Sequence, residues 1–131
     1  MPHIRKEDQK REDCWKGIFR FHGLDRATGC GALSMGVMTL EPHTCMPCHS
    51  HLVEDDMYII EGEGIARADG VDTVLRAGDF ICVPAGAHHY LRNESDSNFV
   101  LVYVWPSRDV ERFLHPDENH VDPKLTIAER P

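Results

Sequence analysis

The stretch from Gly78 to Asn93 reads Gly-Asp-Phe-Ile-Cys-Val-Pro-Ala-Gly-Ala-His-His-Tyr-Leu-Arg-Asn. A short apolar run precedes the Pro-Ala-Gly segment, and a second run with aromatic and apolar residues follows it. Such runs with turn residues between them are typical of two β-strands joined by a tight turn. We therefore interpret this stretch as strand, turn and strand, with the turn placing His89 at the start of the second strand.

The same alternation of short apolar runs with Gly, Pro, Asn and Asp extends from Trp15 to Trp105. The gaps between the runs are too short for the crossover helices that parallel strands require, so we expect an all-β, antiparallel fold. The run Phe99 to Trp105 is apolar on both faces of a strand. We expect it to be covered on both sides, inside by a barrel and outside by another layer or subunit.

The two ends of the chain differ from its centre. Residues 1–14 are mostly charged and predict a solvated N-terminal arm, while residues 15–115 predict one domain. Within that domain, residues 107–114 predict a short C-terminal helix, with Ser107 as N-cap and Val110, Phe113 and Leu114 on one face. Residues 116–131 predict a tail.

Composition narrows the class of protein. The chain has 131 residues and a net charge of -8, which opposes binding to the phosphates of nucleic acid. The sequence contains neither the apolar segment of a secretory signal nor a run long enough to cross a membrane. We expect a cytoplasmic protein with no nucleic-acid or membrane partner.

Histidines and an acidic run indicate a metal site. His49 and His51 are two residues apart, so on a strand their side chains lie on one face, whereas Ser50 faces the other way. His89 follows the Pro-Ala-Gly turn, and Asp55 lies four residues after His51. A set of imidazoles with one carboxylate suits a divalent transition metal ion, with Fe, Mn or Ni favoured and Zn or Co possible.

At these residues the sequence resembles the cupin superfamily, whose members carry two motifs. The motif G-x5-P-x-G-x2-H-x3-N is matched in full by residues 78–93. The motif G-x5-H-x-H-x3,4-E-x6-G is matched by His49, His51 and Gly62, with Asp55 at its acidic position and His43 where the family has Gly. The resemblance covers residues 31–105 and implies a double-stranded β-helix, or jelly-roll barrel, with His49, His51, His89 and Asp55 as metal ligands.

The acidic ligand is the open part of this interpretation. Asp55 is one methylene shorter than the usual Glu of the motif, so Glu54, Asp56 or water are alternatives. Strand alternation places Asp55, and not its two neighbours, on the face of His51. Residues 45–49 also match C-x-x-C-H, a haem-attachment or zinc pattern, but haem attachment would require export and would remove His49 from the other ligands.

The resemblance implies several functions. The leading prediction is a dioxygenase-like oxidoreductase that acts on a small, oxygen-rich organic substrate; the alternatives are a lyase, isomerase or epimerase, or a non-enzymatic binding protein. Acid or base chemistry would need a further residue, for which Tyr58, Tyr103 and Tyr90 are candidates. A substrate carboxylate could meet Arg20, Arg67 or Arg76. We also expect a homodimer, because the strand 99–105 is apolar on both faces.

Overall fold

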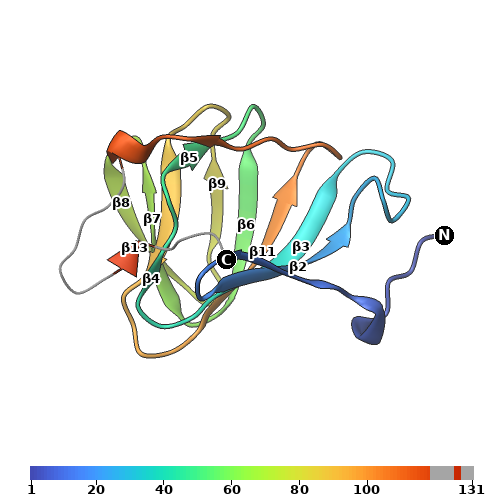
Figure 1. Ribbon diagram of the computed structural model, residues 1–131, viewed down its shortest axis with the longest axis horizontal. Helices are drawn as coiled ribbons and strands as arrows, with labels where there is room; N and C mark the ends of the chain where they lie inside the picture. Colours follow the sequence, from blue (N-terminus) through green and yellow to red (C-terminus); the bar gives the residue numbers. More distant parts are fainter. Residues whose placement is uncertain (119–125, 128–131) are drawn as a thin grey trace.

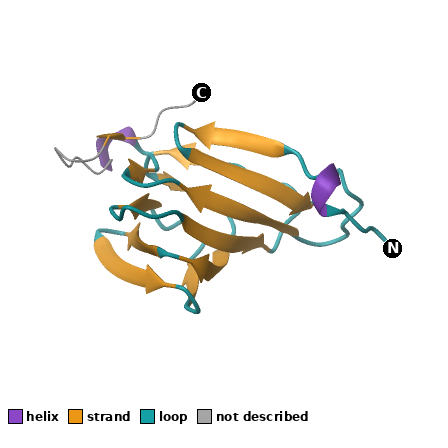
Figure 2. Cartoon of the chain, turned by 90° about the horizontal axis from the view of Figure 1, so that it is seen from below, coloured by secondary structure: helices purple, strands orange, loops and turns teal. Residues whose placement is uncertain are grey.

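The computed structural model describes residues 1–118 and 126–127 of the chain. Two β-sheets lie against each other (Figure 1), and the strands dominate the fold when it is viewed from below (Figure 2). The first sheet has the strand order β1 (Arg11–Trp15), β2 (Ile18–Leu24), β3 (Ser34–Leu40), β11 (Phe99–Trp105), β6 (Asp55–Glu61) and β9 (Phe80–Val83).

The second sheet supplies the other half of the fold. Its path runs β12 (Phe113–Leu114), β5 (His49–Ser50), β10 (His89–Asn93), β4 (Thr44–Cys45) and β13 (Thr126–Ile127), and β10 also pairs with β7 (Glu63–Ala68), which pairs with β8 (Val71–Arg76). The pairings are antiparallel, except that β13 is parallel to β4. The predicted all-β, antiparallel jelly-roll class is confirmed.

The apolar core lies between the two sheets. Strand β11 is central to it, because Phe99, Leu101, Tyr103 and Trp105 alternate onto the inner face and are almost fully buried. On the outer face of the same strand, Val102 and Val104 are only half-buried. The two apolar faces predicted for this strand therefore have different environments, and only the inner face contributes to the core of this chain.

The turn that precedes the histidine pair explains one departure from the family motif. His43 stands where the motif has Gly and has a φ of 57°, in the left-handed region that Gly occupies without strain. Its ring lies 2.7 Å from the carboxylate of Asp96. The motif glycine Gly62 has a φ of 80°, and a Cβ there would lie 2.1 Å from the carbonyl oxygen of Asn98.

The ends of the chain differ from the sequence predictions. Residues 11–14, expected in the charged arm, belong to β1 and pair with β2 of the same chain. The helix predicted for residues 107–114 is wrong: this segment is extended, Phe113–Leu114 forms β12, and the helical residues that follow are a 3-10 turn at Pro116–Glu118 (η2). A second 3-10 turn, η1, spans Lys6–Asp8.

An isolated helix of two turns is unstable, and pairing with β5 satisfies the backbone of the 113–114 segment instead. In the predicted tail, residues 126–127 form β13, and residues 119–125 and 128–131 lie outside the described part of the chain. Among the described residues, no helix is long and apolar enough to span a membrane.

Candidate metal centre

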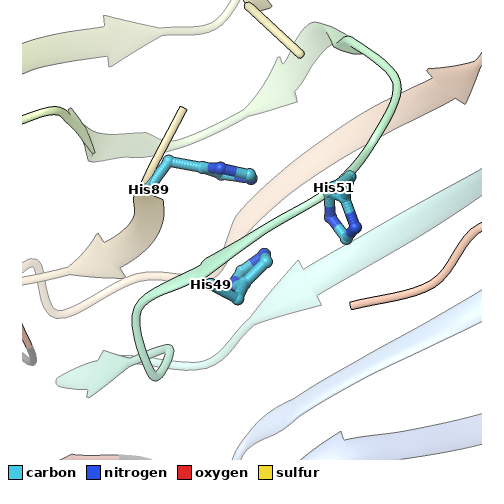
Figure 3. A group of neighbouring side chains, drawn as sticks. All are labelled: His49, His51 and His89. Atoms are coloured by element: carbon cyan, nitrogen blue, oxygen red, sulfur yellow. The ribbon is translucent and has the colours of Figure 1, made fainter. Parts of the chain in front are cut away.

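Three buried histidines converge between the two sheets. His49 in β5 and His89 in β10 are direct cross-strand partners, and His51 follows β5 on the same side (Figure 3). Each of the three residues is 3% exposed, and one nitrogen from each ring lies within 4.8 Å of the others. Two elements far apart in the sequence thus bring together the three histidines predicted as ligands.

The second ring nitrogen of each histidine is held by a backbone carbonyl. The Nδ1 atoms of His49, His51 and His89 lie 2.8, 2.8 and 2.9 Å from the carbonyl oxygens of Pro47, Glu111 and Ala87, respectively. A carbonyl oxygen only accepts, so each Nδ1 carries the proton and donates it. In the neutral rings the lone pair therefore lies on Nε2, the nitrogen left to bind a ligand.

Asp55 completes the cluster from the opposite sheet. Its Oδ2 lies 3.8 Å from Nε2 of His51 and 3.7 Å from Nε2 of His89, too far for a hydrogen bond. Asp55 Oδ1 and His89 Nε2 are buried and have no hydrogen-bond partner among the described residues. Buried acceptors that face one another without a donor are costly, and a bound cation would satisfy them together. The donor set therefore fits a divalent metal ion.

Strand alternation separates Asp55 from its acidic neighbours. Asp55 is 6% exposed and begins β6 on its inner face, whereas Glu54 is exposed and Asp56 is half-buried opposite Cys82 of β9. The two neighbours are grouped with Cys82 on the outside of the sheet. Of the three acids considered from the sequence, Asp55 is the one placed beside the histidines.

The environment of His49 and His51 favours their neutral form. Burial lowers the pKa of His49 well below its ordinary value, and the nearby His89 and Arg112 lower it further. Burial likewise lowers the pKa of His51, against the opposing effects of its bond to Glu111 and of the Asp55 carboxylate. Neutral imidazole is the form that binds metals.

The cluster borders a small cavity of about 20 Å³. This is room for about one water-sized group. Apart from the cluster itself, its walls are mainly apolar side chains from both sheets: Met38, Met46, Met57, Leu91, Leu101, Tyr103 and Trp105, with Arg112 at one side.

Two of these lining residues were not predicted from the sequence. Arg112 lies in the extended segment that was expected to be helical, and its guanidinium carbon is 4.2 Å from the centre of the Trp15 ring. Trp105 is 5% exposed, and its indole Nε1–H has no hydrogen-bond partner among the described residues. Strand alternation places Trp105 on the same inner face as Tyr103, whereas no local pattern indicates Arg112, whose segment is positioned by its pairing with β5.

The candidate tyrosines have different locations. Tyr103 lines the cavity, and its hydroxyl lies 2.5 Å from Nδ1 of His22. Tyr58 is not near the histidines. It follows Met57 on β6 and therefore points to the opposite, outer face of the sheet, where it is 37% exposed and packs on Phe80. Tyr90 is buried and lines a different cavity.

Each of the three candidate arginines is paired with a carboxylate. Arg20 is bonded to Glu12, Arg67 to Asp72, and Arg76 is paired with Glu63. None of these three is among the described residues that line the metal-centre cavity, whereas Arg112 is.

The sequence is similar to known families over this same region. A family model described as "Cupin domain" matches residues 36–105. The chain is 33% identical over 84 residues to a gentisate 1,2-dioxygenase of a Ralstonia species, an alignment that covers 63% of this chain and 23% of that protein. The chain therefore spans less than a quarter of the length of this relative.

Solved structures are similar over most of the chain. The polyketide cyclase RemF of Streptomyces resistomycificus superposes with a TM-score of 0.73 at 21% identity, over 89% of each chain. An RmlC-like cupin of Shewanella frigidimarina superposes with a TM-score of 0.67 at 25% identity, over 80% of this chain and 90% of the other. The first similarity concerns the fold alone.

Proposed function

This chain belongs to the cupin domain family, and we propose that it is a metal-dependent, dioxygenase-like oxidoreductase acting on a small, oxygen-rich organic substrate. The proposal rests above all on one observation. Three buried imidazoles donate their Nδ1 protons outward to carbonyl oxygens, so their Nε2 lone pairs remain for a ligand, and the Nε2 atoms of His51 and His89 lie beside the Asp55 carboxylate. The similarity to a gentisate 1,2-dioxygenase supports an oxygen-dependent reaction on an aromatic hydroxy acid.

The residues that would hold the ion are His49, His51, His89 and Asp55. A bound Fe, Mn or Ni ion would supply a Lewis acid and a redox centre. The chain's own contribution is the mainly apolar wall, which excludes water, and the three carbonyl bonds, which fix the ring orientations.

Two polar groups beside the centre suit an acidic substrate. The Arg112 guanidinium lines the cavity and can pair with a carboxylate, and the Trp105 indole N–H can donate to a substrate oxygen. A cavity of about 20 Å³ is far smaller than an organic acid. Entry of the substrate therefore requires movement of the wall, and the Arg112 segment forms the half-exposed part of that wall.

Oxygen consumption tests the proposal. Purified protein is loaded with Fe(II), Mn(II) or Ni(II) and offered a panel of dihydroxybenzoates, catechols and enolisable diketones. We expect oxygen uptake in proportion to substrate consumed with one of these ions, and its loss in His89→Ala. Turnover of the same substrate without oxygen would contradict the dioxygenase proposal, and tight binding with no turnover would indicate a binding protein.

One observation favours a second candidate, a lyase, isomerase or epimerase. The hydroxyl of Tyr103 lies at the cavity wall, bonded to Nδ1 of His22, whose Nε2 lies 3.3 Å from the carboxylate of Asp25. Burial lowers the pKa of His22, so the ring is neutral and can accept from the tyrosine. Burial raises the pKa of Tyr103, so the phenol keeps the proton that it donates to His22. A proton that the phenol oxygen takes from a substrate could then be matched by transfer of the phenol proton to His22. Anaerobic turnover that is lost in Tyr103→Phe would support this candidate.

We also propose that the chain forms a homodimer through the outer face of the first sheet. Large apolar side chains are exposed there on adjacent strands: Met35, Tyr58, Ile60 and Phe80, with the half-buried Val102 and Val104 beside them. Phe80 is 81% exposed and stacks on its cross-strand partner Tyr58. A second copy of the same face would cover this patch about a two-fold axis.

A further inference from the structure

A second group of potential ligands lies behind the metal centre. His88, His115 and Glu118 place one ligand atom each within 4.8 Å of the others. His88 precedes His89 and Ser50 lies between His49 and His51, so His88 and Ser50 face away from the buried histidines. The Ser50 hydroxyl lies 2.8 Å from Nε2 of His115. The two clusters are therefore on opposite faces of the same pair of strands.

Contacts within this second cluster leave metal-binding atoms available. The rings of His88 and His115 are stacked face to face, with centres 3.6 Å apart and planes inclined by 11°. Because the lone pair of an imidazole lies in the plane of its ring, one of the two rings must turn before both can bind one ion. When Nε2–H of His115 donates to Ser50, the lone pair of that ring remains on Nδ1. Nδ1 of His88 is hydrogen-bonded to the Glu118 carboxylate. An ion that replaces the proton between His88 Nδ1 and the Glu118 carboxylate oxygen could therefore bind both atoms.

The cluster is accessible and its supports are fixed. The side chains of His88 and Glu118 are 38% and 50% exposed, so an ion can enter from solvent without opening the barrel. The backbone N–H of His88 donates to Asp69 at 3.0 Å, and that of His115 donates to the carbonyl of Cys48 at 2.8 Å. A cavity of about 230 Å³, lined in part by Cys48, His88 and Glu118, adjoins the cluster.

The segment from residue 111 to residue 118, called here the strap, connects the two clusters. At its start, the Glu111 carbonyl holds His51 and Arg112 lines the metal-centre cavity. At its end, His115 and Glu118 contribute to the second cluster. In between, Phe113–Leu114 pairs with Ser50 and His49. Anything that binds His88, His115 and Glu118 together also fastens the strap beside the metal centre.

We propose that His88, His115 and Glu118 form a second site for a divalent transition ion such as Zn²⁺, and that an ion bound there holds the strap in place. Two imidazoles and one carboxylate are donors that Zn²⁺ accepts. This site is distinct from the proposed reaction centre, because none of its three ligands belongs to the His49, His51, His89 and Asp55 group.

Zinc titration of the full-length, metal-free chain tests the site. By calorimetry we expect two Zn²⁺ equivalents to bind the unaltered protein and one to bind His115→Ala. In Glu118→Gln the second equivalent should still bind, but with a dissociation constant raised at least about tenfold. His43→Ala is the matched control, because His43 is also a half-exposed histidine but is paired with Asp96 and does not belong to the cluster. It should retain both equivalents.

The two sites can be separated. His49→Ala removes a ligand of the first site only, so one Zn²⁺ equivalent should remain in it and disappear when His115→Ala is added. Zinc should also slow amide exchange of residues 113–118 in His49→Ala but not in His115→Ala. Unchanged zinc binding in both His115→Ala and Glu118→Gln would overturn the site, and zinc binding without slower exchange would overturn the fastening of the strap.

Discussion

His49 and His89 face each other across β5 and β10, and each donates its Nδ1 proton to the carbonyl of the residue two positions before it. The ring centres are 4.4 Å apart. Each strand thus orients its own imidazole with its own backbone, and the strand pairing sets the separation of the two rings. Strands β5 and β10 therefore each direct one Nε2 lone pair toward the same region, and no other side chain is needed to orient either ring.

His89→Ala should remove the stabilisation that a metal ion gives. At a free metal concentration about a hundred times the dissociation constant, binding to the folded state adds about 2.7 kcal/mol. For a chain of this size that is a rise in Tm of roughly 10 °C. We expect this rise with Mn or Ni in the unaltered protein and in His43→Ala, but a much smaller one in His89→Ala. An equal rise in all three, measured by calorimetric scanning, would show that the buried histidines are not the ligands.

Asp55→Asn should change metal affinity and metal-free stability in opposite directions. The amide keeps the shape of the carboxylate but supplies an N–H group that can donate a hydrogen bond to Nε2 of His51 or His89. This bond should raise the free energy of unfolding of the metal-free protein by about 1 kcal/mol. Loss of the anionic ligand should weaken metal binding by more than about tenfold. Urea unfolding and metal titration measure the two quantities. Asp56→Asn is the control, because Asp56 lies one residue away on the other face, and it should alter neither quantity. A loss of metal-free stability in Asp55→Asn would argue that the Asp55 carboxylate and the histidine Nε2 atoms are not acceptors that face one another.

Trp105→Phe should raise KM without lowering metal content. The indole N–H is buried at the cavity and has no partner among the described residues, so its role would begin when a substrate oxygen arrives. Loss of one hydrogen bond of about 1 kcal/mol corresponds to about a fivefold increase in KM. Steady-state kinetics of the metal-loaded enzyme, with metal content measured in the same samples, checks this. A fall in bound metal instead would indicate that Trp105 acts by packing against His51, whose ring centre is 5.4 Å away.

Phe80→Lys should convert a dimer into a monomer. A charged side chain within an apolar interface would have to be buried without a partner, which costs several kcal/mol in each copy. Light scattering after size exclusion measures the mass. Val74→Lys is the matched control, because Val74 is also an exposed strand residue but lies on β8 of the second sheet. A monomeric unaltered protein, or a Phe80→Lys variant that remains dimeric, would contradict the proposed interface.

The sequence was informative where alternation and motif spacing coincide. Alternation predicted that His49 and His51 share a face, and the Pro-Ala-Gly turn predicted the delivery of His89; the structure places all three together. The same rule separated Asp55 from Glu54 and Asp56. In each case the relevant geometry is local, because the side-chain direction of a strand residue depends on its own backbone.

The rest depended on contacts between distant segments. The 107–114 segment has an apolar spacing that also fits a helix, and only its pairing with β5 and its bond to His51 make it extended. Arg112 became part of the site through this packing. The pairing of His115 with Ser50 joins residues 65 positions apart and has no local pattern that would indicate it.

A last prediction concerns the pH dependence of stability. Arg92 is 5% exposed and donates two hydrogen bonds to Asp72, at 3.1 and 2.9 Å, and a third to Glu94. The bonds from Arg92 lower the pKa of Asp72, although its partial burial acts in the opposite direction. A carboxyl with a lowered folded-state pKa stabilises the protein above its ordinary pKa, and that stability is lost as the pH falls through the lowered value.

Asp72→Asn should therefore cost about 1–2 kcal/mol near pH 7, a modest value because Asp72 is partly exposed and screened by solvent. The difference from the unaltered protein should persist down to about pH 5 and then shrink as the pH falls through the lowered pKa of Asp72, where its carboxyl becomes protonated in the folded protein. Urea unfolding at these pH values measures it. Glu63→Gln, which removes the exposed pair with Arg76, should cost less than about 0.5 kcal/mol throughout. A difference for Asp72→Asn that is independent of pH would mean that the carboxylate charge does not stabilise the buried Arg92.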